Sequence, residues 1–243
     1  MPTFEIEDSC PFEIIAGVDE AGRGPLCGPV VAGAVVFVGA NNYLPLQCPV
    51  PINDSKQMTA RQREAAFEWL TTNPDIFWAV GMCSPAEIDE INILQASLLA
   101  MKRAVAGLPC VPGFILVDGN RLPPGISSPP LEGCPEGAGW FTQVSESLVN
   151  HPGASRHPSK GGELFGRAIV QGDSKSMSIA AASIIAKVTR DRMMCELGHE
   201  FPMYGWDKNA GYPTSAHLQA MAKYGINAHY RKTFSPVAKI IKN

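Results

Sequence analysis

Four acidic side chains, far apart in the sequence, are candidates to do chemistry together. Each stands at or just after the end of an apolar segment, and they are Asp19, Glu20, Asp118 and Asp173. If those segments are strands of one sheet, about 5 Å apart, carboxylates at neighbouring strand ends can meet across a gap small enough for metal ions. Oxygen ligands suit Mg²⁺ or Mn²⁺, and two such ions can activate a water and stabilise the leaving oxygen in phosphodiester cleavage. The alternative is that the four acids spread into water.

The adjacent acids Asp19 and Glu20 raise a geometric problem, because neighbouring side chains of a regular strand point to opposite faces. The pair is followed at once by the glycine-rich turn Gly22-Arg23-Gly24. We expect the regular pleat to end at Asp19, so that the turn brings Glu20 back toward the same metal site. Taken alone, the stretch also fits a solvated strand end followed by an ordinary turn.

The pattern of apolar residues predicts the elements that must position these acids. Residues 13–18 and 29–38 are rich in β-branched residues, which favours two antiparallel strands joined at the loop that contains the acid pair. The sequence SPAE at residues 84–87 has the capping-box spacing of a helix start. Further strands are expected at residues 76–82, 114–117 and 167–171, and helices at residues 60–70, 84–106 and 176–197. Asp118 and Asp173 then each follow a predicted strand.

Residues 122–164 interrupt this pattern. Nearly half of them are Pro, Gly or Ser, a composition that cannot bury much apolar surface. We predict a long, partly disordered insertion over these residues.

The charge of the chain is unevenly distributed. The formal net charge of −3 by itself argues against a nucleic-acid partner. However, residues 1–186 carry 11 Lys and Arg against 19 Asp and Glu, whereas residues 187–243 carry 9 against 4. A basic end is what a phosphate backbone would recognise, although a merely solvated polar surface is the alternative.

Composition also bounds the location of the protein. The longest apolar run, residues 30–38, is about half of the ~20 residues that span a bilayer, and the start of the chain does not resemble a signal peptide. We therefore expect a soluble protein with no membrane contact. The seven cysteines are widely spaced and form no CxxC pair, which indicates reduced thiols in a cytoplasm. Without heptads or an apolar interface stripe, we expect a monomer.

Six segments of the chain resemble the ribonuclease HII family, the bacterial type 2 ribonucleases H. They are AGVDEAGRGPLCGPV (16–30), NDSK (53–56), EIDEINILQASLLAMKRAV (87–105), ILVDGN (115–120), GDSKSMSIAAASIIAKVTRDR (172–192) and GYPTSAHL (211–218). They follow in family order, and the combination of DEAGRGP with ASIIAKVTRD is highly specific. The resemblance implies an α/β, ribonuclease H-like fold, with a five-stranded mixed sheet flanked by helices. It also implies one catalytic domain over residues 1–243 that ends in a helical substrate-binding region from about residue 198.

The same resemblance implies an activity and the residues that perform it. The four acids would hold two divalent ions and hydrolyse RNA in an RNA–DNA hybrid, or on the 5′ side of a single ribonucleotide in duplex DNA. The products would carry 3′-hydroxyl and 5′-phosphate ends. By resemblance, the turn contacts the ribose 2′-hydroxyl, a tyrosine packs against the ribose, and a helix contacts phosphates. These positions are Gly22, Arg23 and Gly24, then Tyr212, and then Ser183 and Lys187, with Lys56 as a further phosphate candidate.

Each of these substrate contacts has a simpler interpretation. Two glycines without a Cβ let a backbone approach a 2′-hydroxyl closely, but they also suit a plain hairpin turn. Ser183, Lys187 and Arg190 share one face of a helix, where they could contact phosphates or merely water. Tyr212 could be a core tyrosine. For His217, as for His229, we expect a structural or substrate-side position, because a two-metal site needs no general base.

Two other functions stay open. A non-catalytic nucleic-acid-binding module could keep the fold, but all four matching positions are acidic. A nuclease of the same fold superfamily could act on DNA alone, although it would have no 2′-hydroxyl to sense. Because the connection between Asp118 and Asp173 is longer than is usual in the family, Asp173 is placed by its GDS context and the helix that follows.

Overall fold

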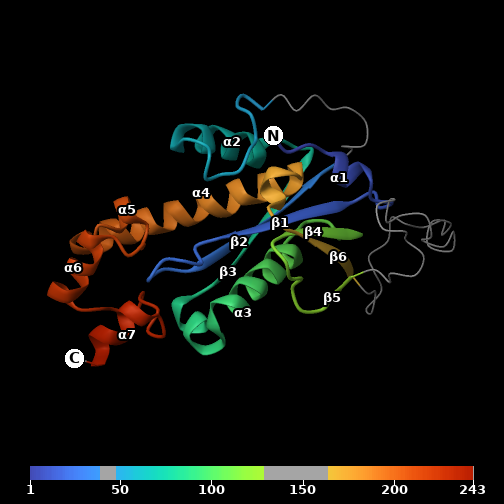
Figure 1. The fold of residues 1–243 in the computed structure, drawn as a ribbon. Coiled ribbons are helices and arrows are strands. Elements are labelled where there is room, and N and C mark those ends of the chain that lie inside the picture. The colour runs from blue at the N-terminus through green and yellow to red at the C-terminus, as the bar shows by residue number, and fades with distance from the viewer. Residues whose placement is uncertain (39–47, 129–163, 243) are drawn as a thin grey trace.

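The computed structural model describes residues 1–38, 48–128 and 164–242. Its centre is a mixed sheet of six strands in the order β3-β2-β1-β4-β6-β5 (Figure 1). The strands are β1 (Ile15–Ala21), β2 (Val30–Phe37), β3 (Ile76–Cys83), β4 (Phe114–Asp118), β5 (Ile126–Ser127) and β6 (Leu164–Ile169). The helices are α1 (Glu5–Asp8), α2 (Ala60–Thr72), α3 (Pro85–Ala106), α4 (Met177–Glu200), α5 (Trp206–Asn209), α6 (Ser215–Tyr224) and α7 (Ser235–Lys242).

Strand direction decides where the acids gather. β1 runs antiparallel to β2 but parallel to β4, and β4 runs parallel to β6. The carboxyl-terminal ends of β1, β4 and β6 therefore lie at the same end of the sheet. An α/β fold places its binding site at this end of the strands.

Helices cover both faces of the sheet, with α3 on one face and α4 together with α2 on the other (Figure 1). Glycines in the strands allow α4 to approach closely. A Cβ on Gly17 would lie 2.1 Å from the Ser178 carbonyl carbon, and one on Gly33 would lie 2.5 Å from the Ala182 oxygen. Because small residues line both sides of this contact, α4 rests almost backbone to backbone on β1 and β2.

The predicted fold class is confirmed, and the number of strands is corrected. The sheet has six strands because β5, a two-residue strand, pairs with β6 beyond the five expected. Ile126–Ser127, which forms this strand, lies in the segment predicted as a partly disordered insertion. Residues 129–163, the greater part of the insertion, lie outside the described residues. None of the helices in the described ranges is long and apolar enough to cross a bilayer.

Beyond α4, the chain forms a small helical region with a core of its own. A 3₁₀ turn (Pro202–Tyr204) and the short helix α5 follow α4, and α6 and α7 complete the region. Trp206 and Tyr230 are fully buried there, and their rings lie 5.5 Å apart. This region lies beside the turn that follows β1, since an isolated β-bridge joins Cys27 to Tyr230.

Candidate active site

Three of the four predicted acids converge at the carboxyl-terminal ends of β1, β4 and β6. Asp19 lies in β1, Asp118 ends β4, and Asp173 lies in the 3₁₀ turn Gly172–Ser174 that follows β6. One carboxylate oxygen from each acid lies within 4.8 Å of the others. Asp19 and Asp173 are buried and Asp118 is half-buried. The parallel pairing of β1, β4 and β6 thus brings together acids that are up to 154 positions apart in the chain (173 − 19).

Backbone donors fix two of these carboxylates. The Glu20 N–H donates to Asp19 Oδ1 at 2.6 Å, and the Gly172 N–H donates to Asp118 Oδ1 at 2.7 Å. Gly172 also packs closely, because a Cβ there would lie 2.6 Å from Ile179 Cδ1 and would displace the end of that side chain. The turn that carries Asp173 is therefore held directly against Asp118.

The electrostatics of this cluster favour a cation. Burial raises the pKa of Asp19 well above its usual range, and the charges of Glu20 and Asp118 add to the effect. Burial also raises the pKa of Asp173, again with help from Asp118. The nearby cation is Lys56, whose Nζ lies 3.8 Å from Asp173 Oδ2 on an exposed side chain. Crowded oxygen ligands whose charges repel one another fit a divalent metal ion.

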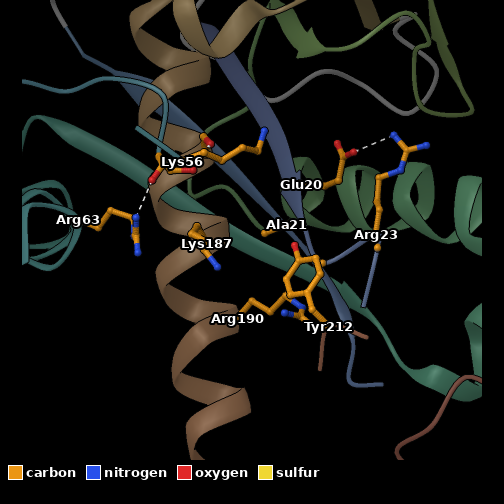
Figure 2. A pocket seen from close by; sticks show the side chains of 12 residues that line it. Glu20, Ala21, Arg23, Lys56, Arg63, Lys187, Arg190 and Tyr212 are labelled. Carbon is orange, nitrogen blue, oxygen red and sulfur yellow. Dashed lines mark hydrogen bonds and ion pairs between the residues drawn. The ribbon is translucent and has the colours of Figure 1, made fainter. Parts of the chain in front are cut away.

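Glu20 lies beside this cluster but does not belong to the group of three. The expectation that the pleat ends at Asp19 is wrong, because β1 continues to Ala21 and Glu20 pairs with Ala32 of β2. The Glu20 carboxylate accepts a hydrogen bond from Arg23 Nη1 at 3.0 Å (Figure 2). Burial raises the pKa of Glu20, the guanidinium of Arg23 lowers it, and the charge of Asp118 raises it further. Asp19 therefore belongs to the acid cluster, whereas Glu20 binds Arg23 of the glycine turn.

A pocket is lined by α4, the glycine turn and the loop before α2, and Glu20 is the acid of the four that its lining includes (Figure 2). All the predicted substrate contacts line it, namely Gly22, Arg23, Gly24, Lys56, Ser183, Lys187 and Tyr212. Arg63 of α2, which the sequence did not single out, lines it too. Its Nη1 donates to the carbonyl of Ser55 at 2.8 Å and to that of Met58, so Arg63 braces the loop that carries Lys56.

Ser183 and Lys187 lie in this pocket in different environments. Ser183 is buried, its Oγ lies 2.8 Å from Ser55 Oγ, and a side-chain hydrogen bond to Asp19 lowers the pKa of that acid. Its hydroxyl thus supports an acid of the cluster. Lys187 is only partly buried and donates to Asp191 Oδ1 at 2.7 Å, which leaves its amino group at the pocket wall.

Tyr212 packs against the glycine turn. A Cβ on Gly24 would lie 3.4 Å from Tyr212 Cε1, and the tyrosine remains 44% exposed. His217 supports it from behind: burial lowers the pKa of His217, so the ring is neutral, and Nδ1 donates to the Tyr212 carbonyl at 2.9 Å. Nε2 then accepts from Trp206 and Tyr230. The structural position expected for His217 is confirmed.

Two buried arginines organise the turn, and the sequence did not predict either role. Arg231 is fully buried, and its guanidinium donates to the carbonyls of Gly22, Arg23, Pro25, Gly28 and Pro29. Burial lowers its pKa to about 9, so it keeps its proton at neutral pH. Arg190 was expected on the polar face of its helix, but it is 1% exposed and donates to the carbonyls of Cys27, Pro29 and Ala210. Burial of an arginine depends on tertiary contacts that one sequence does not reveal.

Gly22 shows why this turn needs glycine. Its φ is +94°, and a Cβ would lie 2.1 Å from Arg190 Nε. A larger residue would therefore strain the backbone and collide with the arginine that supports the turn.

The chain is similar to known proteins in sequence. The family model described as Ribonuclease HII matches residues 16–132 and 143–236. The chain is 46% identical over 232 residues to Ribonuclease HII of Magnetococcus marinus, which covers 95% of this chain and 88% of that protein.

Two solved structures share the fold. The ribonuclease H2 of Pyrococcus horikoshii OT3 is similar with a TM-score of 0.65 at 30% identity, over 94% of this chain and 97% of that one. Bst-RNase HIII in complex with Mn²⁺ gives a TM-score of 0.60 at 17% identity, over 94% of this chain and 69% of that one. At that identity the likeness concerns the fold alone.

Proposed function

The chain belongs to the ribonuclease HII family and is a ribonuclease H endonuclease, and from this premise we propose how its site cleaves. The substrate is RNA in an RNA–DNA hybrid or a single ribonucleotide in duplex DNA, cut on the 5′ side of the ribonucleotide. The products carry 3′-hydroxyl and 5′-phosphate ends. The observation that carries the proposal is the convergence of Asp19, Asp118 and Asp173, whose oxygens lie within 4.8 Å of one another.

Divalent ions, Mg²⁺ or Mn²⁺, are the partners that this acid cluster fits. We assign Asp19, Asp118 and Asp173 to hold them, with Glu20 as the fourth acid at the rim. Two ions held by these residues would supply activation of the attacking water and stabilisation of the leaving oxygen. The chain itself supplies the orientation: backbone N–H groups fix Asp19 and Asp118, and Ser183 supports Asp19.

Selection of a ribonucleotide is assigned to the glycine turn and Tyr212. Gly22 and Gly24 leave the backbone of the turn open to the pocket, where N–H and C=O groups can meet a 2′-hydroxyl. Tyr212 stands directly beside Gly24 with its ring partly exposed, in a position to pack against a sugar. This pairing favours a ribonuclease over a nuclease that acts on DNA alone.

Phosphate contacts are assigned to the basic side chains along the pocket. Lys56 and Lys187 face it from the loop before α2 and from α4, and Arg63 stands behind Lys56 (Figure 2). Contacts of this kind position a duplex without reading its sequence.

The test compares two duplexes, one with a single embedded ribonucleotide and one of DNA only, each with and without Mg²⁺. We expect cleavage 5′ of the ribonucleotide with Mg²⁺ and none in the other three reactions. The Asp118→Asn variant should bind the duplex but cut it at least about 100-fold more slowly, since a charged ligand is lost. Cleavage of the all-DNA duplex would support the DNA nuclease instead. Binding without cleavage by the unaltered chain would support the non-catalytic module.

We also propose that the protein acts as a cytoplasmic monomer. Its six described cysteines are all free thiols, which suits a reducing compartment. Light scattering after gel filtration, with and without duplex, would give the mass of the particle directly.

A further inference from the structure

The N-terminal residues pack against the start of α4 (Figure 1), and they contact Ser176, three residues after Asp173 in the chain. Glu7 of α1 is 5% exposed, and its Oε1 accepts three hydrogen bonds. The donors are Ser176 Oγ at 2.6 Å, the Ser178 N–H at 2.9 Å and Ser178 Oγ at 2.7 Å. Glu7 Oε2 is buried and has no hydrogen-bond partner among the described residues.

A second contact joins the same two segments through the backbone. The Thr3 N–H donates to the Lys175 carbonyl at 3.2 Å, and the Met177 N–H donates to the Thr3 carbonyl at 3.0 Å. Thr3 therefore forms a parallel bridge with Ser176, the N-cap of α4. Residues 3–8 hold the chain from position 175 to position 178 with both side-chain and backbone bonds.

These bonds hold the chain on the C-terminal side of Asp173. On one side of the Gly172–Ser174 turn, the Gly172 N–H is held by Asp118. On the other side, two residues after Asp173, the chain enters the segment held by Thr3 and Glu7. Asp173 thus lies in a short turn that is anchored at both ends.

Burial of a carboxylate costs more free energy than burial of an apolar side chain. An ionised side chain loses its hydration on burial, and an apolar side chain of similar size would pack without that loss. Glu7 instead orients its neighbours, since one of its oxygens accepts from two hydroxyls and one N–H at the first turn of α4. Supporting groups around metal ligands are often needed for affinity although they never touch the ion.

We propose that Glu7, with the backbone bridge at Thr3, is a positioning element that holds Asp173 in place for binding of divalent ions. The inference rests on the proposed function, because it takes Asp173 to be a metal ligand. Residues 3–8 lie outside the segment that matches the family model, which begins at residue 16.

The experiment measures Mn²⁺ binding to the full-length protein by titration calorimetry. The Glu7→Ala variant leaves two hydroxyls and an N–H without their acceptor, and its Mn²⁺ affinity should fall about tenfold. The Glu7→Gln variant keeps an acceptor oxygen of the same reach and should restore the affinity to within about twofold. Glu5→Ala, which removes an exposed carboxylate from the same helix, is the matched control and should bind like the unaltered protein.

A double-variant cycle separates positioning from general damage. If Glu7 acts through Asp173, Glu7→Ala should change Mn²⁺ affinity by less than about twofold when Asp173→Asn is already present. An equal tenfold loss in both backgrounds would overturn the inference, and so would wild-type affinity in Glu7→Ala. Absence of Mn²⁺ binding by the unaltered protein would instead overturn the proposed function, and this inference with it.

Folding of the variants is checked by urea unfolding without metal. If Glu7→Ala does not fold, Ser178→Ala takes its place, because it removes one of the three donors and keeps the N-terminal segment. Its affinity for Mn²⁺ should fall about threefold, the share expected for one hydrogen bond. An unchanged affinity in folded Ser178→Ala would contradict the inference in that case.

Discussion

Asp19 shows how an acidic site opposes the stability of the protein that carries it. Its pKa is raised by burial first and then by the charges of Glu20 and Asp118. A carboxyl group whose pKa is higher in the folded than in the unfolded state binds its proton more tightly when folded. At a pH above this raised pKa, the ionised group therefore lowers the free energy of unfolding. Function and stability make opposite demands on these residues.

The Asp118→Asn variant should reveal this conflict. It removes a charge that raises the pKa of Asp19 and of Asp173, while its side-chain oxygen can still accept from Gly172. Urea unfolding in the presence of a chelator should show a gain of about 1 kcal/mol in the free energy of unfolding. Added Mn²⁺ should raise the melting temperature of the unaltered protein more than that of the variant. Asp75→Asn, an exposed change, is the control, and an equal gain there would contradict the account.

Helix α3 shows which elements the sequence could predict. The Ser84 and Glu87 spacing indicated a capping box, and the structure contains both of its hydrogen bonds. Glu87 then extends this role, because its Oε1 accepts from Arg103 Nη2 at 2.7 Å and links the two ends of the helix. The Arg103 bond, followed by that of the Ser84 N–H, lowers the pKa of Glu87 to about 2.

This low pKa gives α3 a pH dependence with a defined sign. Because the folded-state pKa of about 2 lies below the usual 4.5, ionised Glu87 stabilises the fold above pH 4.5. That contribution is lost as the pH falls toward about 2. Both side chains are more than a third exposed, so the effect is about 0.5 kcal/mol. Urea unfolding near neutral pH should show Glu87→Gln less stable than the unaltered protein, and the difference should shrink at about pH 3. A difference independent of pH would contradict the assignment.

The features that the sequence missed depend on contacts between distant elements. β5 is two residues long, too short for an alternating pattern to mark it. The prediction that the regular pleat ends at Asp19 was wrong, because β1 continues to pair with β2 as far as Ala21 opposite Val31. Ser183 was predicted to contact phosphate and it lines the pocket, but its burial beside Asp19 was not predicted. The strand ends that bring the acids together were predictable, whereas burial of individual polar side chains was not.

The molecule as a whole joins its helical region to its sheet through Arg231. This residue comes from the segment between α6 and α7, yet its guanidinium binds five carbonyls of the turn after β1. The next residues are tied to α3, since the N–H groups of Lys232 and Thr233 donate to Asp89 at 2.8 Å. The shape of the glycine turn is thus set by parts of the chain far from it in sequence.

The Arg231→Lys variant tests this connection. Lysine keeps the charge but cannot reach several carbonyls with a planar fork, so the turn should loosen. We expect kcat/KM on a duplex with one ribonucleotide to fall about tenfold, while the affinity for Mn²⁺ stays within about twofold. Arg121→Lys, at an exposed position, should leave both quantities unchanged. A loss of metal affinity as large as the loss of kcat/KM would show that Arg231 acts on the whole fold instead.

Helix α4 sets the spacing between the acid cluster and the glycine turn. It starts four residues after Asp173, carries Ser183 beneath Asp19, and reaches Arg190 under the glycine turn. One residue inserted between Ser183 and Arg190 would advance the rest of the helix by about 1.5 Å and rotate it by about 100°. Arg190 would then swing away from the carbonyls that it binds, and the glycine turn would lose its alignment with the acid cluster. The length of this helix segment therefore matters to the geometry of the site as much as the side chains that it presents.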